Sequence, residues 1–243
     1  MKLAESLYRV GTDLVNVYLI EDDGAITVID TGIPGQWKDL LAELESMGRS
    51  LEDIQGVILT HADTDHLGFS ERIRRQIGVP VYVHEADAAQ ARGEVKKKNP
   101  AWGRVRLGPT LSFLWYAARR GGLSMTPVEE VVTVHGGETL DLPGAPRIVH
   151  TPGHSPGSIA VHSSAVDALF VGDAMTTRHV LTGETGPQPA PFTLDPGTAL
   201  SSLHKWAELE ARWVLPGHGY PWDQGVSEAV ARVIEMAKGA TGD

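Results

Sequence analysis

The feature that most constrains this chain is the stretch from Leu59 to Gly68, which reads L-T-H-A-D-T-D-H-L-G. It follows an apolar run at residues 56–59 that is typical of a buried strand end. The stretch contains four metal-ligating side chains, His61, Asp63, Asp65 and His66. Buried together, these imidazoles and carboxylates would destabilise a fold unless a cation held them. Because the chain bends at a strand end, they can converge on a metal.

Three further segments each carry one ligand-type residue directly after a short apolar strand. They are Thr151-Pro-Gly-His154-Ser, Val171-Gly-Asp173-Ala and Leu215-Pro-Gly-His218-Gly. Each ligand-type residue lies in a turn that contains Gly or Pro. We therefore expect His154, Asp173 and His218 to be partners of the first cluster.

The composition limits which classes of protein this chain can belong to. The 243 residues are 42% hydrophobic, which suits one large α/β domain. The chain has no cysteine, so a metal must be bound by histidine and carboxylate side chains. Its formal net charge of -10 disfavours nucleic-acid binding, because such affinity comes mostly from Lys and Arg. We expect a single domain over residues 1–243, a small-molecule substrate and no nucleic-acid partner.

The amino-terminal residues lack the long apolar run of a signal peptide, and no stretch of the sequence approaches a membrane span. The absence of cysteine agrees with a reducing compartment. We expect a cytoplasmic protein with no membrane partner, present as a monomer or a homodimer.

Strands followed by helices occur twice, once on each side of about residue 125. The first set has predicted strands at 7–11, 14–20, 25–29, 56–60 and 79–84, and predicted helices at 36–47, 67–77 and 85–91. The second set has predicted strands at 128–135, 139–142, 147–150, 158–162, 168–171 and 212–215, and predicted helices at 194–209 and 226–237. This order predicts two similar halves, each a sheet with helices on its outer face.

The segment from Gly93 to Gly122 interrupts this order. It begins with the basic run Lys96 to Lys98, which we expect to be solvated, and continues into an aromatic-rich stretch from Trp102 to Tyr116. Two interpretations stay open at this point. The segment is either a helical insertion packed on the body or a lid over a substrate pocket.

Five ordered motifs resemble those of the metallo-β-lactamase-fold hydrolases. They are D-T-G at 30–32, T-H-A-D-T-D-H-L-G at 60–68, T-P-G-H-S-P-G-S at 151–158, G-D at 172–173 and P-G-H-G at 216–219. The resemblance covers nearly the whole chain except residues 93–122. It implies an α/β fold in four layers, an αβ/βα sandwich, with a dinuclear metal site at the sheet edge.

Carried over by position, the resemblance assigns ligands to two divalent metal ions. It makes His61 and His154 ligands of the first ion, Asp65, His66 and His218 ligands of the second, and Asp173 the carboxylate that bridges both. Position 63 departs from the family motif, which has His where this chain has Asp63. We expect Asp63 to bind the first ion, with zinc as the first choice of metal and manganese or iron favoured by the added oxygen donor. Binding of a single ion, or an inactive scaffold, are the alternatives.

Two neighbouring cations can lower the pKa of a shared water and direct the resulting hydroxide at an electrophile. We therefore expect a hydrolase of a small ester-like substrate, namely a lactone, thioester, aryl ester or phosphoester, with Asp65 and Asp173 as catalytic residues. Asp65 would move a proton to the leaving group. The alternatives are an iron-dependent oxidoreductase of the same fold, similar to a persulfide dioxygenase, and weak promiscuous β-lactamase or phosphotriesterase activity.

Other polar residues have structural interpretations. Asp30 is expected to bond to a ligand histidine or to nearby backbone, or to cap a turn. Ser155 and Ser158 are expected to support the His154 loop. Surface or structural roles are expected for the remaining histidines, which are His84, His135, His150, His162, His179 and His204.

Overall fold

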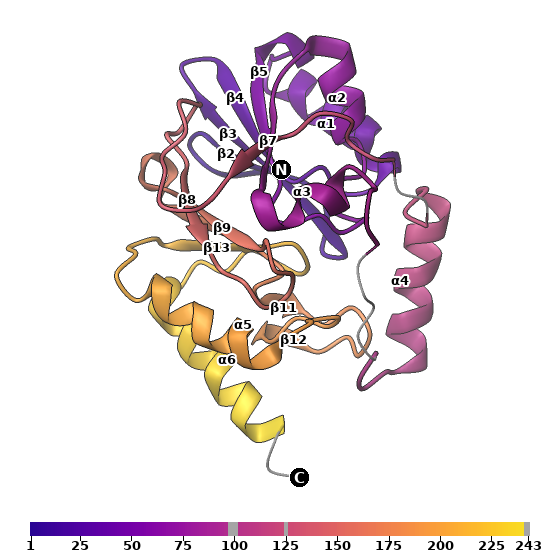
Figure 1. Ribbon diagram of the computed structural model, residues 1–243, viewed down its shortest axis with the longest axis vertical. Coiled ribbons are helices and arrows are strands. Elements are labelled where there is room, and N and C mark those ends of the chain that lie inside the picture. The colour runs from indigo at the N-terminus through magenta and orange to yellow at the C-terminus, as the bar shows by residue number, and fades with distance from the viewer. Residues whose placement is uncertain (97–101, 124–125, 241–243) are drawn as a thin grey trace.

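The computed structural model describes residues 1–96, 102–123 and 126–240 (Figure 1). Its larger sheet has seven strands in the order β1-β2-β3-β4-β5-β6-β7. The strands are β1 (Lys2–Ala4), β2 (Leu7–Thr12), β3 (Val15–Asp22), β4 (Ala25–Ile29), β5 (Ile54–Ile58), β6 (Val81–His84) and β7 (Val132–Val134). The helices between them are α1 (Trp37–Ser46), α2 (Ser70–Ile77) and α3 (Glu85–Ala91).

The direction of the strands changes across this sheet. Strands β1 to β4 are antiparallel neighbours, whereas β4, β5, β6 and β7 run parallel. Parallel neighbours need a crossover connection, and α1 and α2 supply two of them. The parallel strands therefore end at the same edge, which is where the loop with the ligand cluster begins.

The smaller sheet has four strands in the order β13-β10-β9-β8. They are β8 (Arg147–His150), β9 (Ile159–Ser163), β10 (Ala168–Gly172) and β13 (Trp213–Pro216). Helices α5 (Pro196–Ser202) and α6 (Val226–Ala240) follow in this half, and β11 (Thr176–Arg178) pairs with β12 (Thr185–Gln188) as a separate hairpin. Asp195 caps α5 by accepting from the Thr198 N–H at 2.9 Å.

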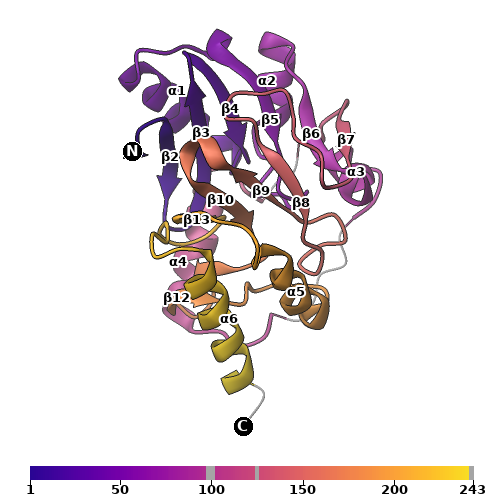
Figure 2. The same cartoon turned by 90° about the vertical axis from the view of Figure 1, so that its left-hand side faces the viewer.

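Three apolar layers separate these elements. The first lies between α1 to α3 and the outer face of the larger sheet, the second lies between the sheets, and the third lies between the smaller sheet and α5 and α6. Each layer contains a large, fully buried side chain, which is Leu40 in the first layer, Phe170 in the second and Trp206 in the third. Figure 2 shows α1 and α2 at one end, α5 and α6 at the other, and the strands of the two main sheets between them. The predicted four-layer αβ/βα sandwich is confirmed.

In its described residues the predicted insertion contains one helix, α4 (Leu107–Arg119), which lies beside the layers (Figure 1). Tyr116 packs with Val15 and Ile33 of the larger-sheet half. At the other end, the Arg106 N–H donates to the Leu181 carbonyl at 2.9 Å. The helix thus spans the two halves. Its role as a lid stays a prediction, and Lys97 and Lys98 of the basic run lie outside the described residues.

Some predicted elements are wrong. Residues 139–142 are no strand and form only an isolated bridge between Thr139 and Arg147. The reason is a tight turn, in which the Ala145 N–H donates to the Leu142 carbonyl at 2.9 Å and reverses the chain before a ladder can extend. The sequence also failed to predict β1, β11 and β12, which are short and lack an apolar alternation.

Among the described residues, no helix combines the length and the apolar character that crossing a membrane requires.

Candidate metal centre

The ligand-type residues meet where four strands end. His61, Asp63, Asp65 and His66 lie on the loop between β5 and α2. His154 follows β8, Asp173 follows β10 and His218 follows β13. All seven predicted metal ligands are therefore brought to one edge of the two sheets.

Two glycines let these loops approach closely. Gly172 has a φ of +49°, in the left-handed region, and a Cβ on it would lie 2.2 Å from Thr60 Oγ1. A Cβ on Gly217 would lie 2.4 Å from His66 Cε1 and 2.6 Å from Asp173 Oδ1. A side chain at either position would force the strand ends apart.

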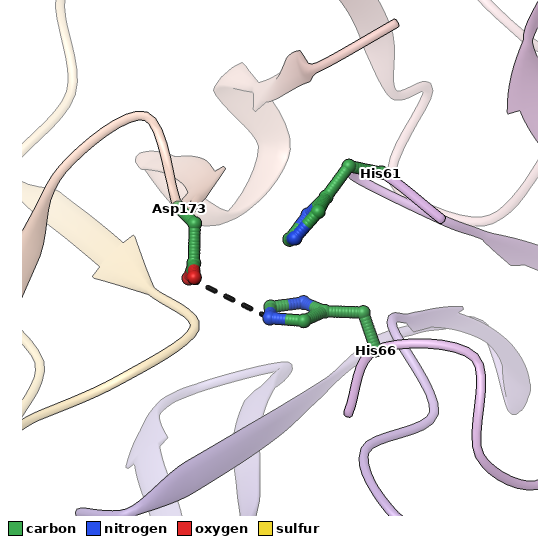
Figure 3. Close-up of side chains that lie close together, drawn as sticks. All are labelled: His61, His66 and Asp173. Atoms are coloured by element: carbon green, nitrogen blue, oxygen red, sulfur yellow. Dashed lines mark ion pairs between the residues drawn. The ribbon is translucent and has the colours of Figure 1, made fainter. Parts of the chain in front are cut away.

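The ligand atoms form three overlapping groups, and within each group they lie within 4.8 Å of one another. We name His61, Asp63 and His154 the first ligand group, and Asp65, His66 and His218 the second ligand group. The third group contains His61, His66 and Asp173, which point toward one another in Figure 3. Each of the seven predicted residues belongs to at least one group.

Asp63 lies between the two histidines of the first ligand group. Its Oδ2 is 3.1 Å from His154 Nε2 and 3.5 Å from His61 Nε2. Its side chain is 18% exposed, whereas those of the two histidines are 1% exposed. The carboxylate thus occupies the outer side of a group whose nitrogens are buried.

Asp173 lies between the two ligand groups. Its Oδ2 is 3.2 Å from His218 Nε2 and 3.8 Å from His154 Nε2, and its Oδ1 is 3.5 Å from His66 Nε2. One carboxylate therefore faces nitrogens of both groups, the arrangement that a bridging ligand requires.

Several of the inward-facing atoms lack hydrogen-bond partners. Within the described part of the chain, His61 Nε2, His66 Nε2 and Asp173 Oδ1 are buried without one. Leaving such atoms unsatisfied costs about 1–3 kcal/mol each. A divalent cation among them would satisfy all three, so the residues fit a bound metal.

Charge at the centre favours a cation. Burial lowers the pKa of His66, but Asp30 and Asp173 outweigh burial and raise it to about 10. Burial likewise opposes the charge on His218, and Asp173 with Asp65 raises its pKa to about 9. Burial raises the pKa of Asp173, but the surrounding imidazoles hold it well below its usual range. The carboxylates therefore attract positive charge, from protons or from a metal.

Asp30 supports the second ligand group without joining it. Its Oδ2 accepts from His66 Nδ1 at 2.8 Å, and its Oδ1 accepts from the Thr60 N–H at 2.7 Å. The Thr60 hydroxyl donates to Asp30 Oδ2 at 2.8 Å and lies 3.1 Å from His61 Nδ1. Because the Nδ1 atoms are occupied, both histidines present Nε2 to the centre. The expectation that Asp30 bonds to a ligand histidine is confirmed.

The remaining ligand histidines are also oriented through Nδ1. His218 Nδ1 donates to the Leu14 carbonyl, and His154 Nδ1 lies 3.3 Å from Thr193 Oγ1. The Ser158 hydroxyl accepts from the Ser155 N–H at 2.9 Å, which confirms the predicted support of the His154 loop.

Sequence reasoning missed two residues of α3 that contact the ligand loops. Asp87 accepts from the Ser155 hydroxyl at 2.6 Å, and Gln90 donates to Asp63 Oδ1 at 3.1 Å. The available signal was an acidic residue at the centre of a short alanine-rich helix, where a buried carboxylate needs partners.

Two of the other histidines have structural contacts with each other and with backbone. His84 and His150 stack with ring centroids 4.0 Å apart, and each has a ring nitrogen 2.9 Å from a backbone carbonyl oxygen. His179 is half-buried, and burial lowers its pKa. An aromatic side chain borders the second ligand group, since the centroid of the Phe113 ring of α4 lies 6.1 Å from that of the His218 ring and the two rings are nearly perpendicular.

Comparisons with known proteins agree with this architecture. The Bacillus subtilis (strain 168) protein YobT, itself uncharacterised, is 27% identical over 233 residues, which cover 92% of this chain and 91% of YobT. The probable metallo-hydrolase YflN of the same strain is 27% identical over 229 residues, covering 90% of this chain and 85% of YflN. The solved structure of TTHA1623 in a di-iron-bound form aligns with a TM-score of 0.62 at 27% identity, over 91% of this chain and 96% of that chain.

A family model described as the metallo-beta-lactamase superfamily matches residues 10–218. This range contains the whole ligand set, from the larger-sheet strands to His218. The chain therefore belongs to the metallo-β-lactamase superfamily, whose fold binds metal ions.

Proposed function

We propose that this protein is a metal-dependent hydrolase that cleaves a small ester-like substrate, a lactone, thioester, aryl ester or phosphoester. The observation that carries the proposal is the position of Asp173, whose two oxygens face nitrogens of both ligand groups. A site that shares one carboxylate between two sets of donors suits two divalent ions.

Two ions bound there would supply an activated water and would polarise the carbonyl or phosphoryl oxygen that the water attacks. The chain's own residues then orient the reaction. Asp65 lies on the outer side of the second ligand group, with its Oδ2 3.4 Å from His218 Nε2 and its side chain 21% exposed. From there its carboxylate can take up a proton and pass it to the leaving group.

Aromatic side chains from the insertion favour a substrate with an apolar part. The Phe113 ring lies nearly perpendicular to the His218 ring, and the Trp102 ring meets the Phe192 ring at a centroid distance of 5.8 Å. Such rings contact acyl or aryl groups through apolar area and not through charge. Lactones with alkyl chains and aryl esters therefore fit better than small charged esters.

The donor set guides the choice of metal. Asp63 adds an oxygen donor where the family motif has a nitrogen, and harder oxygen donors shift preference toward manganese or iron. The relative TTHA1623 is known in a di-iron-bound form. Zinc remains a candidate because four histidines complete the set.

The test is hydrolysis by purified protein stripped of metal and reloaded with Zn²⁺, Mn²⁺ or Fe²⁺. A panel of lactones, thioesters, p-nitrophenyl esters and phosphoesters, each with a short and a long apolar group, is assayed with every metal. We expect turnover only with metal and faster turnover for the longer groups. Absence of turnover on every member with every metal would refute the proposal.

A second candidate is an iron-dependent oxidoreductase of the same fold, acting on a persulfide. The observation that favours it is the combination of an extra carboxylate at position 63 with a relative of known di-iron form. Oxygen consumption by iron-loaded protein with a persulfide substrate, in the absence of ester hydrolysis, would select this candidate over the first.

A further inference from the structure

Helix α3 binds both peptide groups of Ala62, the residue between two members of the first ligand group. Asp87 Oδ2 accepts from the Ala62 N–H at 3.3 Å, and Gln90 Nε2 donates to the Ala62 carbonyl at 2.7 Å. The turn that carries His61 and Asp63 is thereby fixed by side chains from outside the loop.

Gln90 also acts on a ligand side chain. Its Nε2 donates to Asp63 Oδ1 at 3.1 Å, while Asp63 Oδ2 is the oxygen that lies 3.1 Å from His154 Nε2. The two oxygens of this carboxylate therefore face different partners, the amide on one side and the imidazoles of the first ligand group on the other.

Asp87 extends the same support to the His154 loop. It accepts from the Ser155 hydroxyl at 2.6 Å and from the Gly157 N–H at 2.8 Å. A Cβ on Gly157 would lie 2.5 Å from Asp87 Cγ, so the close approach requires glycine. Through two side chains, α3 contacts the loops of all three residues of the first ligand group.

The helix that provides this support is itself fixed. His84 caps α3 by accepting from the Ala86 N–H, and His84 Nε2 lies 2.9 Å from the His135 carbonyl oxygen. Ala88 and Ala91 pack in the apolar layer outside the larger sheet. A rigid base allows side-chain hydrogen bonds to hold a ligand in place.

None of the hydrogen bonds that α3 makes in the described part of the chain reaches the second ligand group. His66 is oriented by Asp30, and His218 by the Leu14 carbonyl. The support from α3 is therefore selective for one half of the centre.

We propose that α3 is the positioning element of the first metal position, and that Gln90 is a positioning residue that makes Asp63 bind through Oδ2 alone. An aspartate reaches less far than the histidine usual at this place, so its single ligand oxygen must be held toward His61 and His154. Gln90 provides that orientation. The inference rests on the proposed metal centre, and it does not require that the substrate be an ester.

The experiment measures metal binding by Gln90→Leu and Gln90→Glu. The first variant removes the amide, and the second keeps its shape but replaces the donor with an acceptor. Metal-stripped proteins are titrated with Mn²⁺ and Zn²⁺ against a chromophoric chelator, and bound metal is counted after dialysis. We expect affinity for one of the two ions to fall about 10- to 100-fold, with affinity for the other unchanged.

Gln36→Leu is the matched control. Gln36 is buried and its amide likewise bonds to backbone, donating to the Val15 carbonyl and accepting from the Ile33 N–H, but it has no bond to a ligand. It reports the general cost of losing a buried glutamine, read as a lower unfolding temperature with both metal affinities retained.

The proposal is overturned if folded Gln90 variants bind both ions with the affinities of the unchanged protein, or if the affinities for both ions fall equally. It is also overturned if the unchanged protein binds only one ion under conditions that saturate the second ligand group. Selective loss of one ion supports it, even where no ester in the panel is cleaved, and in that case only the proposed function fails.

Discussion

The two ligand groups are built by different physical means. The first ligand group is supported by an amide, hydroxyls and the carboxylate of Asp87, and its Asp63 side chain is 18% exposed. The second ligand group contains two histidines whose pKa values are raised to about 10 and about 9. Its His66 is completely buried against the Asp30 carboxylate.

The two groups therefore differ in what prepares them for an ion, which is the orientation of a carboxylate in the first and buried charge in the second. The first ligand group depends on hydrogen bonds that aim a short carboxylate, whereas the second depends on a buried charge network that already carries positive charge without a metal. We therefore expect ion binding at the second position to depend strongly on pH, because protons compete with the ion there, and ion binding at the first position to respond more to small geometric changes.

Removing Asp173 should impair both ligand groups and not only one of them, because this carboxylate faces nitrogens of both. In Asp173→Ala we expect loss of both bound ions and a fall in hydrolysis of at least about 10³-fold, equivalent to about 4 kcal/mol of transition-state stabilisation. Metal content after dialysis and initial rates on the ester panel measure the effect. Asp195→Ala, which removes the cap of α5, is the control and should keep both ions. Two ions retained by Asp173→Ala would show that it bridges nothing.

Asp30→Asn should weaken the second ligand group. The substitution replaces a buried carboxylate that accepts from His66 and Thr60, and breaking a buried charged pair costs about 3–5 kcal/mol of metal-free stability. Affinity for the second ion should fall about 10- to 100-fold. Chemical denaturation and metal titration measure the two effects. If the first ion were lost instead, the assignment of support to each group would be reversed.

The raised pKa values predict a pH signature for the second ligand group. His66 and His218 are protonated in the metal-free protein at pH 7, so a binding ion must displace both protons. Apparent affinity for the second ion should rise between pH 7 and pH 9 by up to about 100-fold per pH unit.

The same pKa values set the stability of the metal-free fold. A histidine whose pKa is raised on folding contributes stability that is fully present below its unfolded value of about 6.5 and is lost as pH rises through the folded pKa. The unfolding temperature of metal-free protein should therefore fall from pH 7 to pH 10. For the metal-binding prediction, titration calorimetry of ion binding in buffers of different ionisation enthalpy counts the protons that His66 and His218 release. Release of no protons on ion binding would contradict that prediction.

The sequence indicated the candidate ligand residues more readily than the residues that support them. The cluster at 61–66 is recognisable because four ligand-type residues lie within six positions. His154, Asp173 and His218 are recognisable because each follows an apolar strand. Their supports come from long-range contacts, such as the pairing of Asp30 with His66 across 36 residues or of His218 with the Leu14 carbonyl across 204. No local pattern encodes which backbone carbonyl will lie beside a given imidazole.

The fold was predictable for a related reason. Largely buried strands such as β3 and β5 are mostly apolar, and helices such as α1 have a clear period, so each element is recognisable locally. The β11–β12 hairpin was missed because its residues are polar, and its position depends on Thr176 donating to the His218 carbonyl at 2.8 Å. Sequence periodicity does not predict elements whose formation depends on tertiary contacts.

Asp63→His should produce the smallest effect and the sharpest test of the alignment argument. Histidine restores the residue usual in the family motif and exchanges an oxygen donor for a nitrogen, so preference for Zn²⁺ over Mn²⁺ at the first position should rise by about tenfold. Because the imidazole has no second carboxylate oxygen for Gln90 to hold, adding Gln90→Leu to this variant should change metal affinity by less than about threefold. Competitive titration of both metals against the single and double variants gives this coupling directly. If Gln90→Leu weakens the Asp63→His protein as strongly as it weakens the unchanged one, Gln90 acts through the Ala62 carbonyl and not through the carboxylate.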